Sequence, residues 1–159
     1  VFVGQHSDKR EDHLSAVRDH RVALWGNRWS RAAPRFGGRH IVHQEPAFGA
    51  TCAALYAAAD VSLNVVDDLN MPGHNMRTFE ITGSGGVMLS CYTAEQAAIF
   101  PEGEAAAYYR TPDELDALLG QLCADTAFAA RLRRNAVAIA AEHSYERRAA
   151  AMSAELGLG

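Results

Sequence analysis

The chain has 159 residues, of which 48% are hydrophobic and 21% charged, so it can bury one core and we expect a single domain. Its net charge of −4 argues against non-specific nucleic-acid binding, which needs a basic face. No segment approaches the roughly 20 apolar residues that span a bilayer, and no secretory signal pattern is present, so we expect no transmembrane segment.

The cysteines and the first residues bear on the context of the protein. Cys52, Cys91 and Cys123 are far apart and stand in apolar surroundings, which is typical of buried thiols in a reduced compartment. We therefore expect a cytoplasmic location and no disulfide frame. The chain opens directly on an apolar strand without an initiator Met, so we expect a domain of a longer polypeptide.

Short apolar runs alternate with helix-forming segments along the whole chain. The predicted strands are residues 1–4, 21–26, 40–43, 60–66, 86–90 and 104–109. The predicted helices are residues 8–20, 47–59, a short one opening at residue 75, then 94–99, 111–124, 126–142 and 144–156. This alternation predicts an α/β fold, a Rossmann-like, doubly wound parallel sheet of about six strands with helices on both faces and a helical C-terminus.

Two segments carry more specific expectations. Residues 27–39 contain four arginines, a proline and two glycines, and are predicted to form an exposed loop. In the helix at 47–59, helical spacing places Phe48, Cys52, Leu55 and Tyr56 on one buried face.

The segment after the fourth strand is the best candidate site. Asn75 is a good N-cap for the short helix, because its side chain accepts from free backbone N–H groups. A helix start beyond the carboxyl end of a strand is where open α/β sheets bind ligands, and it suits anions. Arg77 and Glu80 follow on one face and could serve a phosphate and a sugar hydroxyl. The alternative is an ordinary surface ion pair between the two.

Other polar residues near the predicted strand ends support an anion site. Lys9 and Arg10 begin the first helix, where cations oppose the helix dipole, and this placement makes sense if an anion docks nearby. Simple solvent exposure is the alternative. His74 lies in the turn before the central helix and could touch a phosphate or transfer a proton, although an exposed loop histidine would look the same.

Several familiar motifs are excluded. Residues 83–86 are glycine-rich, but they close a helix instead of following the first strand, so we interpret them as a helix C-cap and not as a dinucleotide fingerprint. No Walker A motif is present. Asp67 and Asp68 lack the partners of a phospho-accepting aspartate, and none of the seven histidines has a recognised metal spacing, so we expect no metal.

At this point the chain resembles the carboxy-terminal, nucleotide-sugar-binding half of GT-B glycosyltransferases, closest to the CgeB-like (spore-maturation type) group of the group-1 transferases. The resemblance covers nearly the whole chain. Three stretches carry it, namely Val1-Phe2-Val3-Gly4 with Lys9-Arg10, Asn75-x-Arg77-x-Phe79-Glu80 with Gly83 and Gly85, and His143-Ser144-Tyr145-Glu146-Arg147-Arg148-Ala149.

The resemblance implies a role for particular residues. Glu80 matches the glutamate that hydrogen-bonds the donor ribose. Asn75 and Arg77 match positions that face the diphosphate, and Gly4 with Lys9 or Arg10 matches the loop that closes over it. His43 and the loop after it would flank the base. Arg77 and His74 are the expected catalytic residues. Such enzymes generally need neither a metal nor another cofactor, because basic groups stabilise the departing diphosphate.

The sequence also departs from the family pattern. Pro72 stands where the first carboxylate of the E-x7-E motif belongs, and Gln5 stands where relatives often have arginine. The expected function is that of a glycosyltransferase donor-binding domain whose partners are a nucleotide-diphosphate sugar and its own N-terminal acceptor domain, without which it is inactive. The alternatives are a non-catalytic nucleotide or sugar-phosphate binding module and, more weakly, an adenosyl- or dinucleotide-dependent enzyme.

Overall fold

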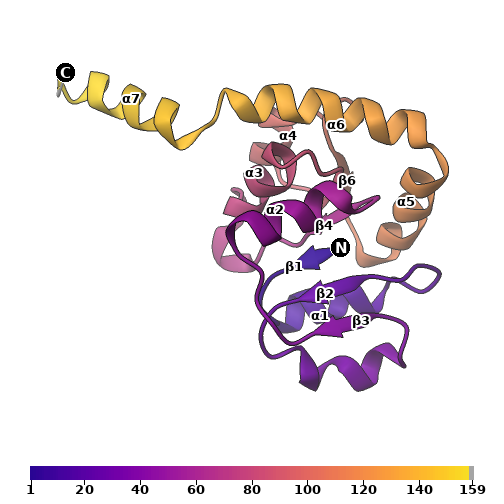
Figure 1. Cartoon of the computed structure of the whole chain (residues 1–159). Coiled ribbons are helices and arrows are strands. Elements are labelled where there is room, and N and C mark those ends of the chain that lie inside the picture. Colours follow the sequence, from indigo (N-terminus) through magenta and orange to yellow (C-terminus); the bar gives the residue numbers. More distant parts are fainter. Residues whose placement is uncertain (158–159) are drawn as a thin grey trace.

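The computed structural model describes residues 1–157, which form the alternating pattern of strands and helices that the sequence predicts (Figure 1). The strands are β1 (Phe2–Val3), β2 (Ala23–Trp25), β3 (Ile41–His43), β4 (Ser62–Asn64), β5 (Met88–Cys91) and β6 (Ala107–Tyr109). The α-helices are α1 (Asp8–Ser15), α2 (Gly49–Ala58), α3 (Met76–Gly83), α4 (Ala94–Ile99), α5 (Pro112–Ala124), α6 (Thr126–Ala141) and α7 (Tyr145–Glu155). Three short 3₁₀-helices are η1 (Trp29–Arg31), η2 (Ala33–Phe36) and η3 (Asp68–Asn70).

The strands form two three-stranded parallel sheets, in the orders β1-β2-β3 and β4-β5-β6. Two hydrogen bonds join the sheets, because the Leu63 N–H donates to the Val1 carbonyl at 2.8 Å and the Val1 amino group donates to the Val61 carbonyl at 2.7 Å. The combined order is β3-β2-β1-β4-β5-β6. The chain therefore winds outward in both directions from the boundary between β1 and β4, which confirms the predicted doubly wound α/β fold.

Successive strand residues face opposite sides of the sheet, so the side chains of a strand pack into two separate hydrophobic cores. Phe2 and Leu89 belong to the hydrophobic cluster that includes side chains of α1 and α5. Their neighbours Val3 and Met88 belong to the second cluster, with side chains of α2, α3 and α6. Because helices cover both faces, β4 is buried along its whole length.

The turn from α3 into β5 confirms the predicted structural role of the glycines. Ser84 is the C-cap, and Gly85 has a φ of +77° that suits a helix end. A Cβ on Gly86 would lie 2.9 Å from the Ile81 side chain, so only glycine allows β5 to begin this close to α3. The glycine run therefore closes α3 and allows its tight packing against β5.

Four expectations from the sequence are wrong. Residues 27–39 are not an exposed loop, because η1 and η2 bury Trp29 and Phe36 almost completely against the core. The first helix ends at Ser15 and not near residue 20. Phe48 is 76% exposed, because it is the N-cap of α2 with extended backbone angles and not a residue of its buried face. Cys123 is exposed, whereas Cys52 and Cys91 are buried as expected.

The last helix differs from the others in its surroundings. α7 extends away from the body of the domain, at the yellow end of the ribbon in Figure 1, and none of its residues is buried. Only its first turn takes part in the site described below. Within the described residues, no helix is both long and apolar enough to cross a membrane.

Candidate functional site

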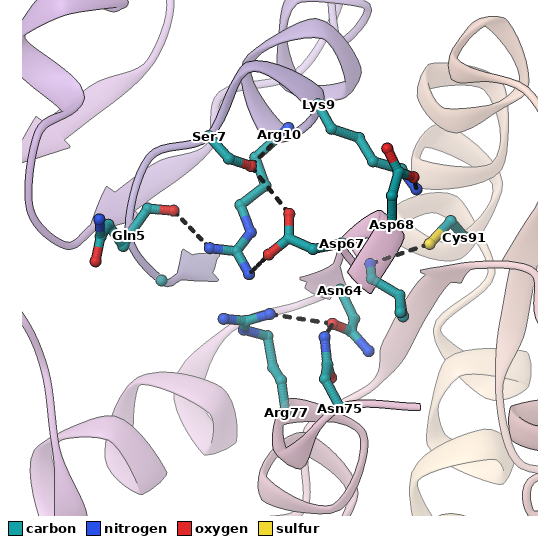
Figure 2. Close-up of polar contacts among 12 residues, drawn as sticks. Gln5, Ser7, Lys9, Arg10, Asn64, Asp67, Asp68, Asn75, Arg77 and Cys91 are labelled. Atoms are coloured by element: carbon teal, nitrogen blue, oxygen red, sulfur yellow. Dashed lines mark hydrogen bonds and ion pairs between the residues drawn. The ribbon is translucent and has the colours of Figure 1, made fainter. Parts of the chain in front are cut away.

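The predicted site lies at the boundary between β1 and β4, where the winding of the sheet reverses. Their carboxyl ends, at Gly4 and Asn64, are adjacent there, and the helices that follow, α1 and α3, both begin at this edge. Diverging loops at such a point leave room for a ligand above the strand ends. Figure 2 shows the polar side chains that meet at this edge.

The start of α3 is held as the sequence predicts. Asn75 is its N-cap, and its side-chain oxygen accepts from the Thr78 N–H at 3.2 Å. The amide nitrogen of Asn75 donates to Asn64 Oδ1 at 3.0 Å, which ties the cap to the end of β4. The helix start is therefore fixed to the sheet by a side chain and not only by its backbone.

Arg77 turns inward, toward the strand ends. Its Nε donates to the Val3 carbonyl at 2.6 Å, and a terminal nitrogen donates to Asn64 Oδ1 at 3.2 Å. A Cβ on Gly4 would lie 2.5 Å from the Arg77 guanidinium, so glycine allows this close approach. The alternative of a surface pair is wrong, because among the described residues Arg77 forms no ion pair with the exposed Glu80.

A buried polar network beneath α3 immobilises this arrangement. Asn64 Nδ2 donates to Thr78 Oγ1 and to Gln96 Oε1, each at 3.2 Å. Thr78 and Ser90 hydroxyls also donate to Gln96 Oε1, both at 3.0 Å. All four side chains are fully buried, and the network supplies the partners that buried polar groups require.

The start of α1 supplies two more cations. Arg10 pairs with Asp67 at 2.6 Å and donates to the Gln5 carbonyl at 2.7 Å, while Lys9 pairs with Asp68 at 2.5 Å (Figure 2). The Lys9 and Arg10 side chains are only 26% and 12% exposed. The alternative that the Lys9 and Arg10 side chains are simply exposed to solvent is therefore wrong. Their anions in this structure are two carboxylates of the loop after β4.

Arg10 and Arg77 form a concentrated positive charge. Both guanidinium groups lie over the ring of Phe2, at 5.8 and 5.0 Å from its centroid. Burial, and after it the positive charge of Arg77, lowers the pKa of Arg10, and Asp67 opposes this effect. Two like charges this close are costly unless an anion joins them, which is a property expected of an anion-binding site.

A groove of about 900 Å³ runs from these arginines along α3 toward the junction of α6 and α7. Arg10, His74, Asn75, Arg77 and Glu80 all line it. The structure thus brings together five of the eight predicted site residues. The signature at the start of α7 lines the opposite wall with His143, Ser144, Tyr145, Glu146 and Arg148.

His74 and Arg148 have defined surroundings in the groove. His74 Nε2 lies 3.1 Å from Glu95 Oε1, and the imidazole edge contacts the ring of Phe79. The Arg148 guanidinium lies over the same Phe79 ring, 4.7 Å from its centroid. His74 is thus not a freely exposed loop residue, since its side chain is 22% exposed.

The remaining predicted residues, Gly4, Lys9 and His43, do not line the groove. Gly4 lies against the Arg77 guanidinium, and Lys9 precedes Arg10 in α1 and pairs with Asp68. His43 ends β3, two strands away from β1, where its ring stacks on Trp25 with centroids 3.9 Å apart. This stacked pair presents a planar surface at the same edge of the sheet.

Sequence reasoning assigned no role at the site to four residues that shape it. Asn64 could have been recognised, because it is a polar residue inside an apolar strand next to a candidate helix start. Asp67 and Asp68 gave no such signal, since their partners lie about 60 residues earlier in the chain. Arg148 was noted only as part of a signature, and no pattern indicated its contact with Phe79.

A second hollow of about 770 Å³ lies between α5 and the segment after α1. One of its carboxylates, that of Asp116, accepts from the backbone N–H groups of Arg18 and Asp19 and from His20, all within 3.0 Å. This carboxylate is satisfied by the fold and caps a turn. We therefore assign it a structural role.

No group of three or more His, Cys, Asp or Glu side chains placed to hold a metal ion is found among residues 1–157. The expectation that the site works without a metal stays a prediction.

Comparisons with known proteins concern the family and the fold of the chain. The sequence matches the family described as glycosyl transferase-like over residues 9–154. No curated protein matches the sequence at a significant level. Among solved structures, Anabaena HepE in complex with UDP-glucose has a TM-score of 0.70 and 17% identity, with 89% of this chain and 43% of that chain covered.

Two further solved structures are similar in fold. A glycosyltransferase from Rickettsia africae has a TM-score of 0.68 and 10% identity, with 89% of this chain and 42% of that chain covered. The C-terminal domain of a group 1 glycosyl transferase from Francisella tularensis has a TM-score of 0.54 and 9% identity, with 87% and 93% covered. The chain spans less than half the length of the HepE and Rickettsia proteins.

Proposed function

The chain belongs to the glycosyl transferase-like family, and from this premise we propose that it is the donor-binding domain of a glycosyltransferase. Its donor is a nucleotide-diphosphate sugar. The finer assignment to the CgeB-like group of group-1 transferases is part of the proposal, and it is supported by the three sequence stretches described above.

The convergence of Lys9, Arg10 and Arg77 at the boundary of β1 and β4 carries this proposal. Both arginines contact the ring of Phe2, and Arg77 is fixed by hydrogen bonds to neutral oxygens, so its charge is not cancelled by these bonds. A diphosphate is a multiply charged anion that can accept from several fixed donors at once. Such a ligand can engage guanidinium groups that two different helices, α1 and α3, supply.

The rest of the donor follows from this placement. Glu80 is exposed on the groove one turn beyond Arg77, where its carboxylate can accept from the ribose hydroxyls. Asn75 and Gly4 shape the diphosphate end through their contacts with Asn64 and Arg77. The stacked ring of His43 provides a surface for the base at the edge of the sheet.

The proposed chemistry is displacement of the diphosphate from the sugar. As the bond between the anomeric carbon and the β-phosphate oxygen breaks, negative charge grows on the departing diphosphate. Fixed cations aimed at that charge stabilise the transition state without having to reorganise. Arg77 is positioned for this by Val3 and Asn64, and His74 lies beside it on the groove wall.

An acceptor must approach the sugar from the open side of the groove. We propose that an N-terminal acceptor domain of the whole protein supplies that side, together with the group that deprotonates the acceptor hydroxyl. The similarity to the C-terminal domain from Francisella tularensis supports this division. The isolated chain is then expected to bind the donor without transferring the sugar.

Isothermal titration with UDP, GDP, ADP and TDP tests the proposal. We expect one nucleotide diphosphate to bind, and Glu80→Ala to weaken its binding by about 1–3 kcal/mol, the cost of losing hydrogen bonds to a carboxylate. Glu104→Ala is the matched control, because it removes the same charge from an exposed residue outside the groove. Equal affinities for the two variants would contradict the placement of the ribose on Glu80.

A further inference from the structure

The loop after β4 places a carboxylate inside the cationic cluster at the start of α1. Asp67 Oδ1 accepts from the Ser7 hydroxyl at 3.0 Å, and its Oδ2 pairs with a terminal nitrogen of Arg10 at 2.6 Å (Figure 2). These contacts join parts of the chain that are about 60 residues apart. One carboxylate thus engages a hydroxyl and a guanidinium, which together form the donor set typical of a phosphate oxygen.

The contact of Asp67 is more sheltered than that of its neighbour. The side chains of Asp67 and Arg10 are 29% and 12% exposed, so water and salt screen their attraction only in part. Asp68 is 84% exposed, and its pair with Lys9 lies at the surface. An exposed pair of this kind contributes little. Asp67 therefore neutralises a sheltered cation, whereas Asp68 pairs with Lys9 at the surface.

The carboxylates leave positive charge uncompensated. Arg77 donates its hydrogen bonds to neutral oxygens of Val3 and Asn64 and forms no ion pair within residues 1–157. The Nε of Arg10 is buried without a hydrogen-bond partner among the same residues. A ligand with two or more negative charges gains more from Arg10 and Arg77 together than Asp67 gains from Arg10 alone. Asp67 can then be displaced, because it belongs to a loop whose tip residues, such as Leu69, are fully exposed.

We propose that Asp67 is an internal competitor of the donor, occupying the diphosphate subsite through Ser7 and Arg10 until a nucleotide diphosphate displaces it. This inference rests on the proposed function, because it assigns the same cations to the diphosphate. Its consequence is that the empty site is partly neutralised, and that the affinity for the donor is lower than the cations alone would give.

The test measures binding of UDP and of inorganic pyrophosphate by titration calorimetry to the wild type, to Asp67→Asn and to Asp68→Asn. Both substitutions remove one negative charge at adjacent positions, and asparagine keeps the size and an acceptor oxygen for Ser7. We expect Asp67→Asn to bind both ligands about threefold to fivefold more tightly, as expected for removal of one ion pair, and Asp68→Asn to change affinity by less than about twofold. Thermal unfolding verifies that each variant is folded.

Each other outcome overturns the inference in a distinct way. Weaker binding by Asp67→Asn would mean that Asp67 positions Arg10 for the ligand and does not compete with it. If both variants bind the ligands more tightly by the same factor, the effect comes from the overall charge of the loop and not from the contact of Asp67. If the wild type binds UDP and Asp67→Asn binds it equally well, the inference fails and the proposed function stands. If no variant binds UDP or pyrophosphate, the diphosphate site itself is refuted, and the inference with it.

Discussion

Replacing Asn64 with alanine tests the network that holds Arg77 and the start of α3. The Asn64 side chain makes four hydrogen bonds, accepting from Asn75 and Arg77 and donating to Thr78 and Gln96. Each hydrogen bond contributes about 1 kcal/mol net to folding. Water can replace part of the two bonds to Asn75 and Arg77, because these two side chains line the groove. We therefore expect Asn64→Ala to lower the free energy of unfolding by about 3–4 kcal/mol, including the small cavity left behind.

Urea unfolding followed by circular dichroism measures this loss, with Thr82→Val as the control. Thr82 is equally buried, but its hydroxyl bonds mainly to the Thr78 carbonyl of the same helix, at 2.8 Å. The control should therefore lose less than about 1 kcal/mol. If the losses of unfolding free energy in Asn64→Ala and Thr82→Val differ by less than about 1 kcal/mol, the network does not hold the site together.

Three further predictions concern the fold. A hydrogen bond from His6 lowers the pKa of Glu11 below its ordinary value of 4.5. The wild type should therefore be more stable than Glu11→Gln above that pH, and this difference in unfolding free energy should fade as the pH falls below it. Unfolding measured across pH checks this. Phe36→Ala should cost about 3–5 kcal/mol of unfolding free energy, whereas Phe48→Ala should cost less than about 1 kcal/mol, and similar losses would contradict their burial. An aromatic disulfide reagent should modify Cys123 rapidly in the native protein and leave the two buried thiols until unfolding; rapid reaction of all three would contradict the core.

The order of strands and helices was predictable from local patterns. Apolar runs of strand length alternate with helices that open on good caps, and Asn75 is the N-cap that its residue type predicted. The doubly wound topology follows because parallel strands need helical connections of one hand. The candidate helix start at the carboxyl end of β4 was predicted for the same reason.

The directions of the side chains were harder to predict from the sequence. Arg77 and Glu80 share a helix face by spacing, but Arg77 points inward because it donates to the Val3 carbonyl and to Asn64 Oδ1. The pairing of Asp67 with Arg10 depends on strand order, which brings β1 and β4 side by side. Residues 27–39 were misjudged because their glycines and arginines obscured the 3₁₀ spacing that buries Trp29 and Phe36.

A crystal structure with UDP at saturating concentration tests the central claim most directly. The account predicts that the diphosphate lies between the guanidinium groups of Arg10 and Arg77, within hydrogen-bond distance of both, and that the ribose lies against Glu80. It also predicts that the Asp67 carboxylate has left Arg10. A nucleotide bound elsewhere, such as in the hollow beside Asp116, with the pair of Asp67 and Arg10 intact, would contradict the assignment of this edge of the sheet as the donor site.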